Sequence, residues 1–303
     1  MAIQVKNGKA FEWSVAQKIS EITKLPIAET PESHINKEHY LNLDVNKKII
    51  FDRSAAKAVE HIVQKEKKKL IGTGFITFNP DSAGKQGDVR DVLIRLEQNI
   101  IGISCKTNHE ALKHSRLSKN IDFVLSWGLH KDGCSTDYWN KVSPIFKELE
   151  DIAKKSNKKA LWADYEDKAN RVYWPILDAW EEEILRIKSL SEKNEEEMCR
   201  NMVHYLIGKY DFYKIISHGK GKADIHAYNF NNTLDTRRSK LPTHLNSINN
   251  KNGTQYSKTI TFNGGYSINF RIHSASSRVE PSLKFDIVAI GLPTGEIYQQ
   301  TFD

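Results

Sequence analysis

The chain has 303 residues, 39% of them hydrophobic, and its 45 Lys and Arg against 38 Asp and Glu give a formal net charge of +7. It has no run of 18 apolar residues and its start lacks the apolar core of a signal peptide, which argues against a membrane protein and predicts a cytoplasmic one. Its three cysteines are far apart, unlike a paired zinc site or a disulfide framework, and the basic charge favours an anionic partner such as nucleic acid.

An amphipathic helix is predicted over residues 8–24, where Phe11, Val15 and Ile19 recur at helical spacing. Glu12 lies one place from this apolar stripe, from which it could reach a neighbouring site; otherwise it is a solvated first-turn acid. Residues 25–45 contain two prolines and mixed polar residues, which predicts a loop.

A second helix is predicted over residues 54–70, with Ser54 as its N-cap and Glu60 along it. The looser alternation of residues 71–78 predicts a strand that ends at Asn79-Pro80.

A β-hairpin is predicted over residues 87–106, where two short aliphatic runs flank Gln98-Asn99. If these two residues form the turn, Asp91 lies opposite Lys106. Ser104 joins them on one face, because side chains two apart on a strand point the same way. The hairpin therefore gathers an acid, a hydroxyl and an amine.

Phosphodiester hydrolysis suits such a group of side chains. Asp91 could hold Mg²⁺, and Lys106 could orient or deprotonate an attacking water. The arrangement resembles the core of PD-(D/E)xK nucleases, with Ser104 in place of the usual second acid, so another group must complete the metal shell. Asp88 is the alternative first acid or an outer partner, and the candidates for the missing ligand are Glu12, Glu60, Glu97 and Glu110.

Downstream, Asn108 is predicted to cap a helix with Leu112 and Leu117 on its apolar side. Its basic side could contact the DNA backbone, or it could be an ordinary surface helix; the basic residues are Lys113, His114, Arg116 and Lys119. Residues 132–197 are predicted to be mostly helical with an aromatic core, and residues 198–218 to pass from helix to strand at Gly208.

Residues 218–252 are rich in Gly, Asn, Lys and Arg, which predicts a loop that could carry Arg237 and Arg238 onto DNA or serve as a linker. From Thr259 onward the pattern predicts strands. Sequence readout of guanine is expected there, because arginine can donate two hydrogen bonds to that base; the candidates are Arg271, His273, Arg278 and Lys284.

The predicted fold class is α/β, an α+β arrangement around a mixed sheet. We expect a nuclease core over residues 1–130, a helical insertion over 131–205, and a C-terminal β-rich region over 206–303 that completes the sheet and reads DNA.

Four separated stretches together resemble the HaeIII family of type II restriction endonucleases. They are GDVRDVLI, IGISCKTNHEALKHSRLSKNIDF, YLIGKYDFYKIIS and FRIHSASSRVEPSLKFDI, in this order between about Asp88 and Leu292. The N-terminal 80 residues match only in outline, as a GKAFE-type helix.

The resemblance implies an Mg²⁺-dependent enzyme that cuts double-stranded DNA at GGCC and leaves blunt ends. Asp91 and Lys106 match the family's acid and lysine, and Ser104 takes the position between them; Asp88, Asn108, His109, Lys113, His114 and Arg116 match its extended motif. A two-fold symmetric target also suggests a homodimer on DNA, the alternative being a monomer that acts on each strand in turn. The alternatives are a DNA-binding protein that has lost catalysis with its second acid, and a repair-type nuclease with another target.

Overall fold

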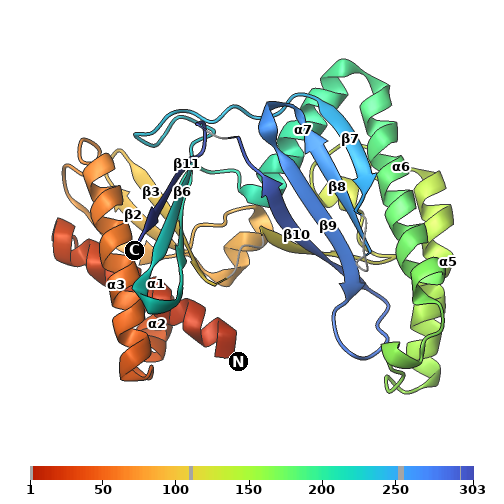
Figure 1. The fold of residues 1–303 in the computed structure, drawn as a ribbon, viewed down its shortest axis with the longest axis horizontal. Helices are drawn as coiled ribbons and strands as arrows, with labels where there is room; N and C mark the ends of the chain where they lie inside the picture. The colour runs from red at the N-terminus through yellow and green to blue at the C-terminus, as the bar shows by residue number, and fades with distance from the viewer. Residues whose placement is uncertain (1–2, 109–111, 252–255, 294) are drawn as a thin grey trace. The chain divides into compact units, whose positions relative to one another are not determined.

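The computed structural model describes residues 3–108, 112–251, 256–293 and 295–303 (Figure 1), without the side chains at 84–86, 113 and 114. The chain forms two compact units. The first contains residues 1–110, 208–240 and 294–303, and the second contains residues 111–207 and 241–293. The chain is thus divided differently from the three consecutive stretches expected from the sequence, because it leaves the first unit and returns to it twice.

Three helices belong to the first unit: α1 (Ile3–Thr23), α2 (Pro31–Leu41) and α3 (Val45–Lys65). The predicted amphipathic helix is confirmed by α1, whose Phe11, Val15 and Ile19 are buried. The loop predicted over residues 25–45 is wrong, because α2 occupies it. Pro31 stands in the first turn of α2, where no N–H is needed, and Thr30 and Ser33 form a capping box before it.

The predicted start of the next helix at Ser54 is also wrong. Asp44 is the N-cap of α3 and accepts a hydrogen bond from the Lys47 amide at 2.9 Å. Ser54 instead lies inside α3, fully buried, and donates to the carbonyl of Lys222 at 2.9 Å. Its hydroxyl joins the helix to the sheet.

Replacing Asp44 with alanine should lower the free energy of unfolding by about 1 kcal/mol, because the first turn of α3 loses its side-chain acceptor. Urea titration followed by circular dichroism measures this difference. The Asp44→Asn variant keeps an acceptor and should stay within a few tenths of a kcal/mol of the wild type; an equal loss in both variants would contradict the capping role.

The first unit contains a six-stranded mixed sheet in the order β1-β2-β3-β5-β6-β11. Its strands are β1 (Gly74–Phe78), β2 (Val92–Leu96), β3 (Ile100–Thr107), β5 (Phe212–Ser217), β6 (Ala223–Tyr228) and β11 (Tyr298–Phe302). Neighbours are antiparallel except β3 and β5, which run parallel. The strand at 71–78 and the hairpin strands are confirmed, whereas the loop predicted from 218 to 252 is wrong, since β6 and β7 (Leu245–Asn250) lie within it.

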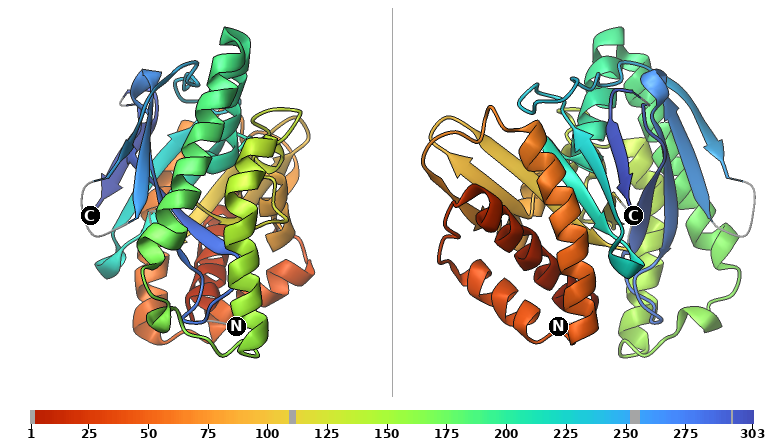
Figure 2. Two further views of the ribbon diagram at one scale, coloured as in Figure 1. Left: turned by 90° about the vertical axis from the view of Figure 1, so that its right-hand side faces the viewer. Right: turned by 60° about the vertical axis from the view of Figure 1, so that its left-hand side comes forward.

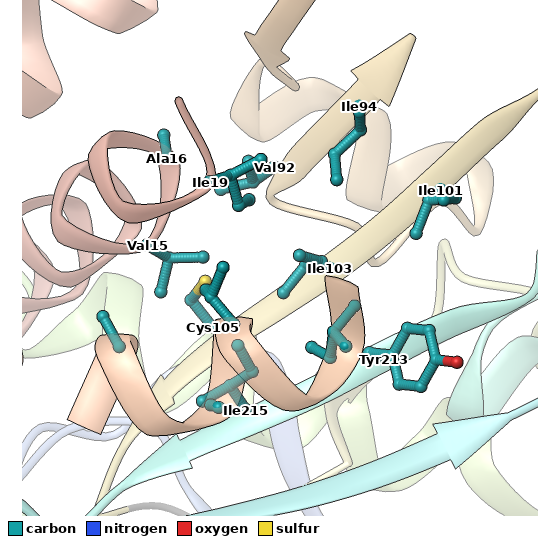
Figure 3. Packing of buried hydrophobic residues seen from close by; sticks show 14 of the residues in the cluster. Val15, Ala16, Ile19, Val92, Ile94, Ile101, Ile103, Cys105, Tyr213 and Ile215 are labelled. Atoms are coloured by element: carbon teal, nitrogen blue, oxygen red, sulfur yellow. The ribbon is translucent and has the colours of Figure 1, made fainter. Parts of the chain in front are cut away.

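Helices α1 and α3 pack on one face of this sheet (Figure 2), and a continuous apolar cluster fills the space between them. Figure 3 shows Val15 and Ile19 of α1 close to Ile103 and Cys105 of β3, with Ile215 of β5 nearby. Side chains alternate along a strand, so the residues between these, including Ser104 and Lys106, point to the opposite face.

The second unit contains an antiparallel sheet in the order β4-β10-β9-β8-β7. The strands not yet given are β4 (Lys113–Leu117), β8 (Ser257–Phe262), β9 (Ser267–Ser274) and β10 (Leu283–Gly291). The helices are α4 (Phe123–Ser126), α5 (Thr136–Lys155), α6 (Trp174–Leu190) and α7 (Glu192–Ile207). Short 3-10 or π turns are Asp81–Gln86, Trp162–Asp164, Ala169–Tyr173, Gly219–Gly221 and Asn263–Gly265. The strands predicted after Thr259 and the helices predicted over 132–197 are confirmed.

The helix predicted after Asn108 is wrong. Ser115 and Leu117 are buried while Arg116 between them is exposed, which is the two-residue period of a strand. That strand, β4, pairs with β10 at the edge of the second sheet. Its basic residues therefore lie on a strand rather than on a helix.

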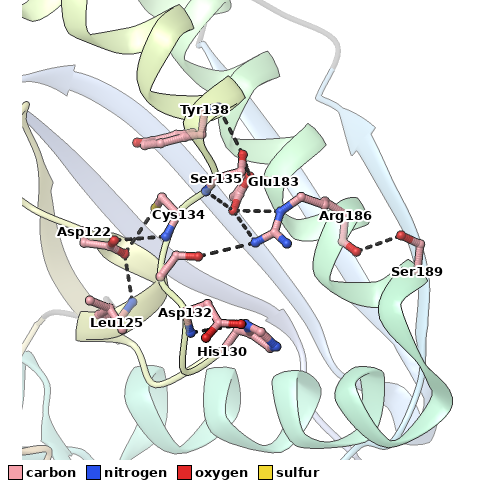
Figure 4. A network of polar contacts seen from close by, with 11 residues as sticks. Asp122, Leu125, His130, Asp132, Cys134, Ser135, Tyr138, Glu183, Arg186 and Ser189 are labelled. Atoms are coloured by element: carbon pink, nitrogen blue, oxygen red, sulfur yellow. Dashed lines mark hydrogen bonds and ion pairs between the residues drawn. The ribbon is translucent and has the colours of Figure 1, made fainter.

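A buried carboxylate joins two helices of the second unit (Figure 4). Glu183 of α6 accepts hydrogen bonds from the amide and hydroxyl of Ser135, at 2.8 and 2.6 Å, and from Arg186 at 2.7 Å. Ser135 is the N-cap of α5, so one acid anchors the start of that helix. The aromatic core is also confirmed: the fully buried Trp180 contacts Phe123, Trp127, Phe270 and Phe285.

Across the described ranges, no helix is long and apolar enough to cross a membrane.

Candidate functional site

Three groups converge on the carboxylate of Asp91, just before β2. Its Oδ2 accepts hydrogen bonds from the Ser104 hydroxyl at 3.1 Å, the Cys105 amide at 2.6 Å and the Lys106 ammonium at 3.3 Å. The predicted meeting of an acid, a hydroxyl and an amine is therefore confirmed as geometry. Asp91 and Lys106 are both partly exposed, so a ligand can reach the pair.

The register of the hairpin differs from the expected one. Val92 pairs with Ile103 and Arg95 with Ile100, and the Leu96 amide donates to the Asn99 carbonyl at 2.9 Å, so the turn is Glu97-Gln98 and not Gln98-Asn99. Asp91 therefore lies level with Ser104 and not with Lys106. The shift of two residues leaves every side chain on its predicted face, because the strand period is also two.

A second acid lies near Asp91. Glu12 of α1 is 6% exposed and its Oε2 accepts hydrogen bonds from Asn36 at 2.9 Å and from Lys9 at 3.3 Å. Burial, together with the negative charge of Asp91, raises the pKa of Glu12 to about 7. A buried carboxylate whose charge is disfavoured by a neighbouring carboxylate is typical of a site that a cation completes.

This raised pKa predicts how stability depends on pH without metal. The pKa of Glu12 lies above its ordinary 4.5, so the stability it contributes is fully present below pH 4.5 and is lost as the pH rises through about 7. We expect the free energy of unfolding in EDTA to fall between pH 5 and 8 by on the order of a few kcal/mol more in the wild type than in Glu12→Gln, and the melting temperature to fall with it. Thermal denaturation at both pH values tests this, and parallel curves for the two proteins would contradict it.

Lys106 carries the positive charge of the site. Partial burial by itself lowers the pKa of Lys106, but the neighbouring Asp91 outweighs this effect and the net shift is upward from 10.5. The ammonium form is therefore favoured near neutral pH. In this form Lys106 can donate hydrogen bonds and stabilise negative charge.

The other candidate acids fit the site less well. Glu60 lies on the exposed side of α3. Glu97 accepts a hydrogen bond from Thr73 at 2.7 Å in the loop at the far end of the hairpin from Asp91. Glu110 lies outside the described residues, as does His109.

Asp88 is engaged elsewhere. Arg90 donates to both of its carboxylate oxygens at 2.7 Å. Burial alone would raise the pKa of Asp88, but these bonds lower it below its usual value. Arg90 also lies over the ring of Tyr210 at 4.1 Å, so Asp88 holds Arg90 in place and is not joined to Asp91.

The donor set near Asp91 fits a hard divalent cation. Within the described ranges, no group of three His, Cys, Asp or Glu side chains stands ready as a metal site. Two carboxylates and a hydroxyl, from Glu12, Asp91 and Ser104, are all oxygen donors, and Mg²⁺ is commonly held by one or two carboxylates and keeps several waters. The residues present fit such an ion.

The residues of the first unit that were predicted to contact DNA do not all lie near Asp91. Asn108 directly follows β3, is exposed, and donates its backbone amide to the Ser217 carbonyl at 3.0 Å. Arg237 and Arg238 donate to the backbone carbonyls of Gly295 and Phe230, at 3.4 and 3.0 Å. Asn108 thus lies two residues beyond Lys106, while the side chains of the two arginines bind backbone carbonyls within the first unit.

In the second unit, three of the residues predicted to contact DNA bases surround the carboxylate of Asp286. Arg271 contacts Asp286 of β10, with His273 at 3.0 Å and Lys284 at 3.8 Å from the same carboxylate. Burial would raise the pKa of Asp286, but Arg271 and His273 lower it well below its usual range. This acid was missed in the sequence, although its place opposite Arg271 follows once β9 and β10 are paired.

Two other predicted contacts in the second unit are exposed. Arg116 on β4 donates to Ser282 at 2.9 Å, and Arg278 follows β9. The side chains of Lys113 and His114 lie outside the described part of the structure.

Two further residues at the site went unnoticed in the sequence. Asn36 is fully buried and donates to Glu12, and Lys9 bridges Glu12 and Asp81. The signal for Asn36 was the capping sequence Thr30-Pro31, which marks the start of the helix that carries it.

Comparison with known proteins places these residues in a wider context. The profile of the HaeIII restriction endonuclease family matches residues 8–293. The chain is 34% identical over 316 aligned residues to the type II restriction enzyme HaeIII of Haemophilus aegyptius, which covers 97% of this chain and 96% of that enzyme. No solved structure matches the chain.

Proposed function

Because this chain belongs to the HaeIII restriction endonuclease family, we propose that it is a type II restriction endonuclease that hydrolyses double-stranded DNA at a specific sequence. The observation that carries the proposal is the convergence of Ser104, Cys105 and Lys106 on Asp91, beside the buried Glu12. Family membership supplies the substrate class, and the geometry supplies groups suited to the reaction.

The proposed cofactor is Mg²⁺, held by Asp91 and Glu12 with Ser104 as a further oxygen ligand or as a donor to a bound water. When bound, the ion polarises the phosphoryl oxygen and lowers the pKa of a water. The Cys105 amide fixes the Asp91 carboxylate, and Asn36 and Lys9 fix that of Glu12.

Lys106 orients the attacking water and stabilises the negative charge that develops on the phosphate. Its raised pKa favours this electrostatic role over that of a base. The phosphorus–oxygen bond to the leaving nucleotide breaks as the bond to the water oxygen forms. The attacking water gives up its proton to solvent, and the leaving oxygen takes one from solvent.

The first unit is proposed to be a PD-(D/E)xK-type core with Ser104 at the position of the second acid. The mixed sheet, the hairpin that carries Asp91 and Lys106, and the helix that carries Glu12 support this assignment. The cations around Asp286 are proposed to read bases from the second unit, as arginine can contact guanine.

The target GGCC with blunt ends is proposed from the family alone. A two-fold symmetric target favours a homodimer on DNA, and DNA as the substrate favours action in the cytoplasm.

Plasmid digestion tests the proposal. With Mg²⁺ we expect a discrete ladder whose fragments have blunt ends at GGCC, and no cleavage in EDTA. A protein that shifts DNA in a gel with Mg²⁺ but never nicks it would be the non-catalytic binder that the loss of an acid at Ser104 suggests. Fragments with unrelated ends would identify a repair-type nuclease instead.

A further inference from the structure

A histidine and an acid share the sheet face on which the Asp91 site lies. On the parallel strand next to β3, Ile216 is level with Lys106, and on β6 Asp224 is level with Ile216. Side chains at one level point to the same face, and so do residues two apart on one strand. Asp224 and His218 therefore lie on the face of Ser104 and Lys106, opposite the apolar cluster that contains Cys105 and Ile215.

The position of His218 is fixed by its surroundings. Its Nε2 lies 2.7 Å from Oδ2 of Asp224, and its amide donates to the Lys222 carbonyl at 2.9 Å. Ser54 of α3 donates to the same carbonyl at 2.9 Å and accepts from Ser217 at 3.0 Å. The turn is thus anchored to a helix as well as to the sheet, and the imidazole is held in one orientation.

The remaining ring nitrogen of His218 can meet a ligand. Its side chain is 31% exposed, and within the described ranges Nδ1 has no hydrogen-bond partner. The adjoining turn Gly219–Gly221 presents the exposed Lys220. A doubly protonated imidazole here would donate Nε2–H to Asp224 and Nδ1–H to an anion.

The distance to the Asp91 site suits an extended anionic ligand. His218 lies on the strand next to that of Lys106 and two residues further along it. With ordinary strand spacing, the Cα atoms of the two residues are roughly 8 Å apart. This offset is too large for both residues to bind one oxygen atom, but it suits neighbouring groups of one polymer backbone.

We propose that His218, oriented by Asp224, binds a DNA backbone phosphate next to the one that is cut. The inference rests on the proposed function, because it takes the strand at Asp91 to be DNA. Contacts of this kind fix the register of the strand and carry no sequence information. His218 is thus assigned to binding the strand on which Asp91 and Lys106 act.

The experiment compares the wild type with His218→Gln, binding a fluorescent GGCC duplex in Ca²⁺ at several salt concentrations. Loss of one charge-assisted phosphate contact should weaken binding roughly tenfold. It should also reduce the slope of log K against log salt by about 0.9. The single-turnover cleavage rate at saturating DNA in Mg²⁺ should stay within about twofold of the wild type, as expected of a residue that binds and positions.

A chemical change in the DNA identifies the contact. Replacing single phosphates beside the scissile one by neutral methylphosphonates should weaken binding by the wild type at one position and leave His218→Gln unaffected there. The matched control is His34→Gln, which alters an exposed histidine on α2. Melting temperatures show whether each variant is folded.

Two results would overturn the inference: unchanged affinity and salt slope in His218→Gln, or a large fall in the saturating cleavage rate with unchanged affinity. Failure of the wild type to cut any plasmid would instead reject the proposed nuclease function. A wrong assignment of His218 can therefore be told apart from a wrong assignment of the function.

Discussion

Replacement of Lys106 by alanine is expected to lower the rate of DNA cleavage in Mg²⁺ by a factor on the order of 10² or more. The ammonium lies 3.3 Å from the Asp91 carboxylate and has no replacement on β3, so both the orientation of water and the stabilisation of charge are lost. Single-turnover digestion of a plasmid at saturating enzyme measures the effect. Binding of the duplex in Ca²⁺ should be nearly unchanged.

A control for charge alone is Lys18→Ala, which removes an ammonium from α1 where it pairs with Glu21. This variant should cut at the wild-type rate. Lys106→Arg keeps the charge but not the compact ammonium, and should recover only part of the activity. Cleavage by Lys106→Ala at the wild-type rate would contradict the proposed role of Lys106 in the reaction.

Glu12→Gln is expected to cause a loss of similar size, on the order of 10² in cleavage rate at low Mg²⁺ concentration, because the site loses one of its two carboxylates. The amide can still accept a hydrogen bond but cannot neutralise a cation. The dependence of the rate on Mg²⁺ concentration should shift to higher values, and direct titration with Mn²⁺ by calorimetry should show weaker binding.

Glu60→Gln is the matched comparison, because Glu60 is the same residue type on the exposed side of α3. We expect its cleavage rate and its Mn²⁺ affinity to equal those of the wild type. The reverse pattern, with loss in Glu60→Gln and none in Glu12→Gln, would reassign the metal ligand.

The hairpin could be predicted because local rules decide it. Two aliphatic runs identified both strands, and the side chains of Asp91, Ser104 and Lys106 kept their predicted face even though the turn is Glu97-Gln98 and not Gln98-Asn99. Registers that differ by an even number give the same faces. The cluster at Asp91 was therefore predictable without the exact pairing.

Other elements depend on partners far away in the sequence. The stretch around Ser115 and Leu117 fits a helical spacing as well as an alternating one, and pairing with β10 decides for the strand. In β6, Asp224 and His226 alternate with apolar residues, a local strand signal that the Gly-, Asn- and Lys-rich composition around it outweighed in the prediction.

The choice of Glu12 over Glu60 was likewise not readable from spacing. It depends on how α1 packs on the sheet, which buries Glu12 near Asp91 and leaves Glu60 on α3 exposed. The capping box at Thr30 was a local signal that could have identified α2, and with it Asn36.

The order of the strands has a consequence for folding. The sheet that supports Asp91 joins β3 directly to β5, which follows about 100 residues later in the chain. Strand β4 of the second sheet and the helices α4 to α7 lie in the sequence between these two strands. Because the pairing must close this long loop before it gains any contacts, the sheet is expected to assemble late and slowly.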